Sequence, residues 1–200
     1  MRCANCKDRK CYTDGKDCTN NANGILKKYT QEDLEISRLA TSIESRFYKK
    51  FTRLEEIIVF SEEMGYKRLG IAFCIGLSSE AKMLTKILEK RFHVDSVVCK
   101  CAGISKDSLD FPKIDPDRYE SICNPIGQAD ILNRCKTDLN IALGLCIGHD
   151  ILFARHSKAP VTTLIVKDRV LAHNPAGALY SGYYRDSIGN KLTQNTRSDD

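Results

Sequence analysis

The chain has 200 residues, a formal net charge of +5 and ten cysteines. This length can bury a core without disulfides, and basic residues that always have acidic neighbours disfavour a nucleic-acid partner. The most apolar stretch, residues 139–147, is far shorter than the roughly 20 residues that cross a bilayer. The start lacks the features of a signal peptide, so we expect a cytoplasmic protein without a membrane partner. In that reducing compartment, cysteines favour metal or thiol chemistry over disulfides.

The first 24 residues form a cysteine-rich head with almost no apolar side chains. Such a segment cannot stabilise itself by burial, so a bound metal is the expected source of its order. Four cysteines in the spacing C-x2-C-x4-C-x6-C are the predicted metal ligands: Cys3, Cys6, Cys11 and Cys18. The spacing matches neither the usual zinc ribbon nor the common ferredoxin patterns, so zinc and an iron–sulfur cluster both stay open.

A helical arm is predicted after the head. Apolar residues at helical spacing indicate helices over about 31–50 and 53–64. Thr30 has the form of an N-cap, Thr52 begins a capping box, and Gly65 is the expected end of the second helix. The apolar stripes of both helices are expected to face a core.

The rest of the chain alternates between strands and helices. Strands are expected at 68–75, 94–99 and 139–146, helices at 78–92, 125–135 and 149–156, and a hairpin of 161–167 with 170–173. This alternation predicts an α/β fold with three layers, in which helices cover both faces of a largely parallel sheet. We therefore divide the chain into the head (1–24), the arm plus α/β body (25–187) and a polar, mobile tail (188–200).

Four body cysteines occupy related positions in this scheme: Cys74, Cys99, Cys123 and Cys146. Three of them end apolar strands and Cys123 precedes a helix. Because the carboxyl ends of parallel strands share one edge, we expect these thiols to line one ligand-binding crevice. Cys101 is an alternative to Cys99, and Cys135 is assigned to packing. The competing interpretation is that all of these cysteines are small core residues.

Three polar residues near this edge are weaker candidates. His149 is a candidate ligand, acid–base group or substrate contact, whereas Asp150 fits a role at the start of a helix. Lys100 is either solvated or lowers the pKa of a neighbouring thiol. The sequence contains no nucleotide-binding glycine loop and no hydrolase nucleophile motif.

Several motifs resemble a family of uncharacterised prokaryotic proteins that are described as predicted metal-binding and carry a domain of unknown function. The motifs are Cys3-x2-Cys6, Cys74, Cys99-Lys100, Cys123-Asn124-Pro125-Ile126, the segment 144–150 and the segment 166–175. The resemblance extends from Cys3 to about Tyr184 and implies metal binding without naming a reaction. A Cys-Lys pair after the second strand is typical of the family and favours Cys99, whereas a C-x-G pattern shared by Cys74, Cys101 and Cys146 favours Cys101.

The leading hypothesis is a metalloprotein with two cysteine sites. The four body cysteines would hold an iron–sulfur cluster of the 4Fe–4S type for redox or Lewis-acid chemistry, with a redox partner or a small-molecule ligand. A second hypothesis is a zinc-stabilised module that binds or senses a soft metal without catalysis. A third is an enzyme that uses one cysteine of low pKa near His149 as its nucleophile.

Overall fold

The computed structural model describes the backbone of residues 1–195 and the side chains of residues 1–188. The chain separates into two compact units, Met1–Lys50 and Phe51–Asp200. Each unit has its own local structure and is described by itself.

The first unit contains the head and the first helix of the arm. Short helical turns, η1 (Cys3–Asn5), α1 (Lys10–Thr13) and α2 (Ala22–Leu26), precede the long helix α3 (Gln31–Phe47). The predicted N-cap is confirmed, because Thr30 and Asp33 form a reciprocal capping box. Every residue before Gly24 is exposed, so local hydrogen bonds take the place of a core. The Asp17 carboxylate supplies several of them, since it accepts from the backbone of Thr19 and Ala22 at 2.9 Å each.

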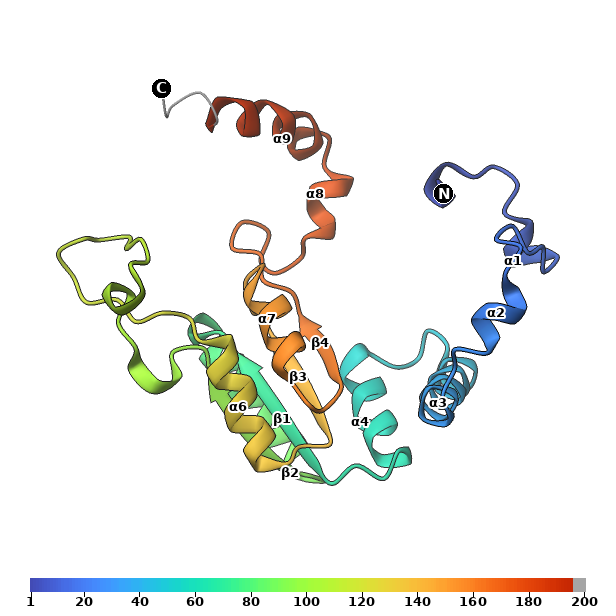
Figure 1. Cartoon of the computed structure of the whole chain (residues 1–200), viewed down its shortest axis with the longest axis horizontal. Helices are drawn as coiled ribbons and strands as arrows, with labels where there is room; N and C mark the ends of the chain where they lie inside the picture. Colours follow the sequence, from blue (N-terminus) through green and yellow to red (C-terminus); the bar gives the residue numbers. More distant parts are fainter. Residues whose placement is uncertain (196–200) are drawn as a thin grey trace. The chain divides into compact units, whose positions relative to one another are not determined.

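The second unit is built on a four-stranded sheet with the order β2-β1-β3-β4, in which every pair is parallel (Figure 1). The strands are β1 (Arg68–Phe73), β2 (His93–Val98), β3 (Leu139–Leu143) and β4 (Val161–Ile165). The predicted α/β fold is therefore confirmed. Strands β1 and β3 lie in the centre, and their residues are almost all buried because helices cover both faces.

Helices on the two faces create two separate cores. On one face, α4 (Arg53–Glu63) and α5 (Ser78–Leu88) pack on alternate residues of the central strands, such as Ile71 and Ile141. On the other face, α6 (Pro125–Cys135) and α7 (His149–His156) lie side by side and pack on Ala72 and Ala142 (Figure 1). This arrangement gives the three predicted layers.

The connections place a topological switch point in the centre of the sheet. The chain leaves β1 through α5 on one face and leaves β3 through α7 on the other, although the two strands are neighbours. Because helices diverge from adjacent carboxyl ends at such a point, the backbone there is open to ligands. Any site in this fold is therefore expected beyond Phe73 and Leu143.

Two buried polar side chains stabilise the sheet. Asn140 accepts from Thr137 Oγ1 and donates to Ser157 Oγ, both at 2.8 Å, and it fills the space that a side chain at Gly70 would need. Gln128 of α6 donates to the carbonyl oxygens of Val97 at 2.7 Å and Phe73 at 3.2 Å. It thereby ties α6 to the carboxyl ends of β1 and β2.

Several sequence predictions need correction. Residues 161–173 do not form a hairpin: β4 pairs with β3 in parallel, and a turn follows it because the Asp168 carboxylate accepts from the backbone of Val170 and Leu171. The strands end two or three residues before their predicted limits at 75 and 146, and α5 ends at Leu88 instead of 92. Helix α8 (Ala176–Tyr180) was not predicted.

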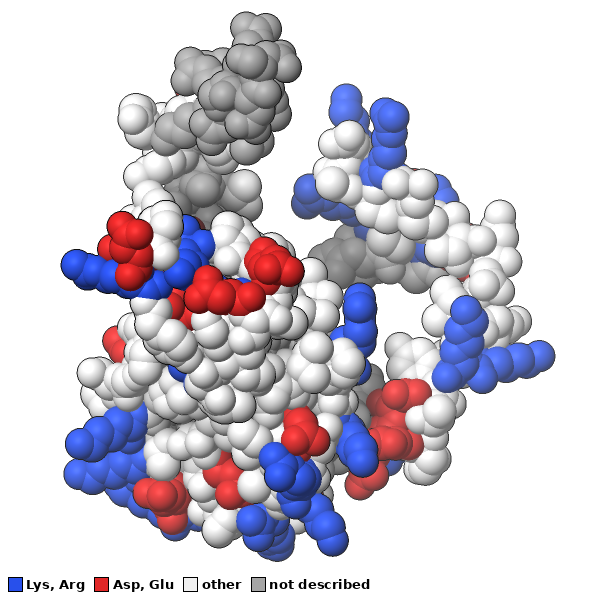
Figure 2. Space-filling model, turned by 60° about the vertical axis from the view of Figure 1, so that its left-hand side comes forward, with Lys and Arg blue, Asp and Glu red and all other residues white. Residues whose placement is uncertain are grey.

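The predicted tail 188–200 overlaps the last helix, and its mobility stays a prediction. Helix α9 (Gly182–Asn195) includes most of the segment 188–200, and residues 196–200 of the predicted tail lie outside the described residues. Among the described residues, no helix combines the length and the apolar character needed to cross a membrane. On the face shown in Figure 2, basic and acidic side chains are interspersed.

Candidate thiol site

Three cysteines from different segments meet at the carboxyl edge of the sheet. Cys74 directly follows β1 and Cys99 directly follows β2, and both are buried, with exposed fractions of 8% and 3%. They pack with the buried Leu77, and the half-buried Cys123 packs against this cluster from the start of α6. The alignment of β1 with β2 pairs Phe73 with Val98, which places the two following cysteines side by side.

A hydrogen bond between Cys99 and Cys123 organises the charges of this cluster. Cys99 donates to the sulfur of Cys123, which lowers the pKa of Cys123 to about 5, with further contributions from the charges of Lys100 and His149. The same bond, together with burial, raises the pKa of Cys99. Cys99 also accepts from the backbone amide of Ile75 at 3.3 Å. The two opposite shifts favour the thiolate at Cys123 and the thiol at Cys99.

Cys146 belongs to the same edge through Arg169. The guanidinium of Arg169 donates to the sulfur of Cys146 at 3.0 Å. Its pKa is raised first by this bond and by the negative charge of Cys146, and then by the charges of Cys74 and Cys123. One guanidinium thus interacts with thiols that come from the ends of β1 and β3 and from the start of α6.

The loop after β4 is built to present Arg169. The Asp168 carboxylate accepts from the amides of Val170 and Leu171 at 2.8 Å each, and His173 Nδ1 accepts from the Asp168 amide at 3.1 Å. Ala172 and His173 adopt positive φ angles of 49° and 64°, which tighten the turn. The segment predicted as a hairpin turn is therefore a compact loop, from which Arg169 contacts the Cys146 sulfur.

Two lysines extend the positive charge around the cysteines. Lys100 donates from Nζ to the carbonyl oxygen of Ser121 at 2.6 Å, and its charge favours the Cys123 thiolate. Lys167 and Cys74 both approach Gly76, since a Cβ atom added at Gly76 would be 3.4 Å from Lys167 Nζ and 4.0 Å from Cys74 Sγ. His149 is half-buried at the start of α7, and Asp150 lies in the first turn of that helix.

The other cysteines of the body lie elsewhere. Cys101 packs against the core beneath α6, and its sulfur donates to the carbonyl oxygen of Asn124 at 3.7 Å. The structure thus places Cys99, and not Cys101, in the cluster with Cys74. Cys135, at the end of α6, is half-buried, and burial raises its pKa.

The head cysteines form a separate group in the first unit. Cys3, Cys6, Cys11 and Cys18 are all exposed free thiols. Cys3 and Cys6 share a tight turn, in which the Cys6 amide donates to the Cys3 carbonyl at 3.0 Å. Lys16 pairs with Asp8 at 2.6 Å and is close enough to Cys6 and Cys18 to sense their charge.

Metal coordination is not preformed in either group. Within residues 1–188, no three His, Cys, Asp or Glu side chains are arranged to hold a metal ion. The body cysteines are instead joined by hydrogen bonds between sulfur atoms and to Arg169. The predicted ligands thus gather, but their present side-chain arrangement is that of a thiol cluster.

Sequence reasoning missed three residues of this site: Gln128, Lys167 and Arg169. The sequence interpretation placed Lys167 at the end of a hairpin strand and Arg169 in the turn, so neither was a candidate for the site. Gln128 had no distinguishing signal, because a single glutamine on a helix is ordinarily exposed. The one available hint was the pair of basic residues immediately after a strand, at the same edge as the cysteines.

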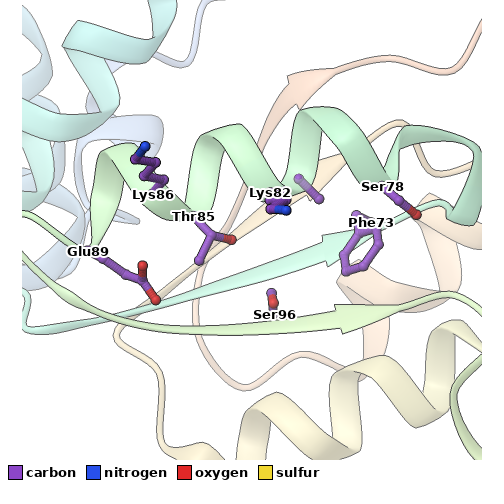
Figure 3. A pocket seen from close by; sticks show the side chains of 8 residues that line it. Phe73, Ser78, Lys82, Thr85, Lys86, Glu89 and Ser96 are labelled. Carbon is purple, nitrogen blue, oxygen red and sulfur yellow. The ribbon is translucent and has the colours of Figure 1, made fainter.

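A cavity of about 390 Å³ lies apart from the thiols, on the α5 side of β1 and β2 (Figure 3). Its wall includes Phe73 and Ser96 from the strands, Ser78 and Lys82 from α5, and Glu89 directly after that helix. The side chains are of mixed character and include no cysteine or histidine. It provides no chemistry related to the thiol site.

The fold and the thiol cluster together define a cysteine-rich α/β protein. The chain belongs to the family DUF1847, a protein of unknown function, whose model matches residues 13–164. It is 57% identical to an uncharacterized protein of Methanocaldococcus jannaschii (MJ0455) over 186 residues, which cover 92% of this chain and 96% of that protein. No solved structure matches the chain.

Proposed function

We propose that this protein is a metal-binding protein whose functional centre is held by Cys74, Cys99, Cys123 and Cys146, with a second metal bound by the four head cysteines. The contact among Cys74, Cys99 and Cys123 at the switch point carries the proposal. Thiols from three segments converge where ligands bind in parallel α/β sheets. An iron–sulfur cluster fits this set best, because its ligands are thiolates and the site is buried and cationic.

The surroundings of the cysteines suit a bound thiolate centre. Thiolate ligands are stabilised by hydrogen bonds to sulfur, and Ile75 and Arg169 already donate to Cys99 and Cys146. Lys100 and Arg169 offset the negative charge that several thiolates would accumulate. When bound, the centre would supply electron transfer or Lewis-acid chemistry. Because no coordination set is preformed, binding would also rotate these side chains from their present hydrogen bonds.

The test is anaerobic production with iron and zinc, followed by absorbance and metal analysis. Cys74→Ser with Cys123→Ser should remove the visible absorbance and its iron, whereas Cys3→Ser with Cys6→Ser should remove only the metal of the head. Cys135→Ala is the matched control, because this cysteine lies outside both sets. If the protein were colourless and held only zinc, the iron–sulfur proposal would be rejected in favour of a zinc-binding or sensing module. Unchanged metal content in the Cys74 and Cys123 variant would refute the body site.

A second candidate function is thiol–disulfide chemistry, which the hydrogen bond between Cys99 and Cys123 favours. The Cys123 thiolate would attack a partner disulfide and release one partner thiolate. The Cys99 sulfur, after losing its proton to that leaving thiolate, would then displace the second partner sulfur and form a Cys99–Cys123 disulfide. The partner disulfide is thereby reduced by two electrons, and the protein thiols are oxidised.

A disulfide-exchange assay distinguishes the two functions. Metal-free protein treated with oxidised glutathione should form one intramolecular disulfide, which peptide mapping would assign to Cys99 and Cys123. The Cys99→Ser variant should stop at a mixed disulfide on Cys123. If oxidation instead gave random pairings among the body cysteines, the thiol–disulfide function would be rejected and the metal proposal would be unaffected.

A further inference from the structure

Three positive side chains gather at the thiol site. Lys100, Lys167 and Arg169 reach the carboxyl edge from the segments after β2 and β4. Helices α6 and α7 also begin there, and their first-turn amides add positive potential. Lysine and arginine are charged at neutral pH, so this edge attracts anions.

The nearest carboxylates are already engaged with the backbone. Asp150 accepts from the Ile151 amide at 2.8 Å, and Asp168 accepts from the amides of Val170 and Leu171. In the part of the chain that the structure describes, none of the three cations forms an ion pair with a carboxylate. Their charge is therefore not taken up by a direct contact with a carboxylate, and it remains available to an anion.

Two of the three cations have clear local roles. Lys100 donates to the Ser121 carbonyl and favours the Cys123 thiolate, and Arg169 donates to Cys146. Lys167 has neither role: within the described residues, its ammonium makes no hydrogen bond. It is half-buried, although a lysine without a partner is ordinarily solvated.

Glycines provide the path that brings Lys167 to this position. A side chain at Gly144 would lie 3.9 Å from Lys167 Cδ, and one at Gly76 would lie 3.4 Å from its Nζ. The stem of Lys167 therefore passes Gly144, and its ammonium ends near Gly76, the glycine that the Cys74 sulfur also approaches. The lysine points toward the thiols and not away from the sheet.

We infer that Lys167 binds the anionic group, a carboxylate or a phosphate, of a small-molecule ligand that lies against the thiol cluster. The inference rests on the proposed function only in taking this cluster as the functional centre. Lys100 and Arg169 add to the attraction while they hold the sulfur atoms. The thiols or their metal would act on the part of the ligand next to this anionic group.

Titration calorimetry of the reduced full-length chain with malonate and with inorganic phosphate tests the inference. Lys167→Met should weaken the binding of the preferred anion about tenfold, the effect of one lost close ion pair in a partly buried site. Lys158→Met is the matched control, because Lys158 precedes β4 and Lys167 follows it, so the same charge is removed at the opposite edge. A preference for malonate or phosphate identifies the ligand group. Undetectable binding of both in the millimolar range, or equal loss in the two variants, would overturn the inference.

Alkylation of metal-free protein gives a second readout. Iodoacetate is an anion and iodoacetamide is neutral, and both form a carbon–sulfur bond with the same thiolate and release iodide. The ratio of their rates at Cys123 therefore cancels any change in the thiolate fraction. Lys167→Met should lower this ratio about tenfold and Lys158→Met should leave it unchanged. An unchanged ratio in Lys167→Met would refute the anion site, whereas the metal content of the iron-loaded protein separately decides the proposed function.

Discussion

Cys99, which follows β2, donates a hydrogen bond to the sulfur of Cys123, which begins the approach to α6. The loop 102–122 lies between them, yet the backbone closes around the pair, since the Asn124 amide donates to the Cys99 carbonyl at 2.7 Å. This hydrogen bond raises the pKa of Cys99 and lowers the pKa of Cys123. This relationship defines which thiol is reactive.

Alkylation by iodoacetamide should identify Cys123 as the fast thiol. Its pKa is lowered to about 5 by the hydrogen bond from Cys99 and by the charges of Lys100 and His149. Its rate should therefore rise through pH 5 and be constant at neutral pH, where an ordinary thiol is still gaining reactivity. Mass spectrometry of quenched samples measures the rate at each cysteine. Uniform labelling of the body cysteines at neutral pH would contradict this assignment.

Variants of Cys99 test the cause of the low pKa. Cys99→Ala removes the donor and should move the Cys123 midpoint upward, toward the ordinary thiol range. Cys99→Ser keeps a hydroxyl donor and should preserve most of the shift. If both variants retained the midpoint near 5, Lys100 and His149 would be its main cause, and the hydrogen bond would be a minor contribution.

The loop 102–122 should loosen in acid. The pKa of Glu120 is lowered to about 2, first by its bond from Lys106 and then by the backbone amides of Asp115 and Ile114. Because the folded pKa is below the usual 4.5, the stabilisation is complete above that value and is lost as the pH falls toward 2. The protection of the Ile114 and Asp115 amides from hydrogen exchange, relative to the intrinsic exchange rate at each pH, should fall over this range. Glu120→Gln should reproduce the effect at neutral pH, and exposed Glu89→Gln should not.

Replacing Gln128 should destabilise the junction between α6 and the sheet. Gln128→Leu leaves the Val97 carbonyl without its 2.7 Å donor in a buried position. The expected loss in the free energy of unfolding is about 1–3 kcal/mol, the cost of an unsatisfied buried polar group. Asp130→Leu, at an exposed position of the same helix, should change the free energy of unfolding by about 0.5 kcal/mol or less. Urea unfolding measures both, and equal small effects would show that water replaces the glutamine.

Gly144 should tolerate a side chain less well than Gly148. Both have positive φ angles, 66° and 85°, so alanine is strained at each. At Gly144 the added Cβ would also lie 1.8 Å from Leu77 Cδ1, whereas nothing is within 4 Å at Gly148. Leu77 is buried against Cys74 and Cys99. Gly144→Ala should therefore lower the free energy of unfolding by about 1–3 kcal/mol more than Gly148→Ala does, and it should disturb the thiol cluster. Unfolding midpoints compare the two, and equal losses would mean that Leu77 moves freely.

Local signals in the sequence predicted most of the elements. These signals act within a few residues, so the sequence alone predicts them. They are the capping boxes at Thr30 and Thr52, Gly65 with its φ of 73°, and Pro125 in the first turn of α6. Strand ends were less predictable. Apolar residues continue past Phe73 into Cys74 and Ile75, although pairing in the sheet stops at Phe73.

The sequence by itself determined the α/β alternation and the recurrence of cysteines after strands, because both follow from local patterns of side chains. Only the tertiary structure decided that Cys99 joins Cys74 while Cys101 packs beneath α6. It also decided that Lys167 and Arg169 face the thiols, because β4 pairs in parallel with β3 and not in a hairpin. These choices depend on strand order and register, which are set by packing between residues far apart in the chain.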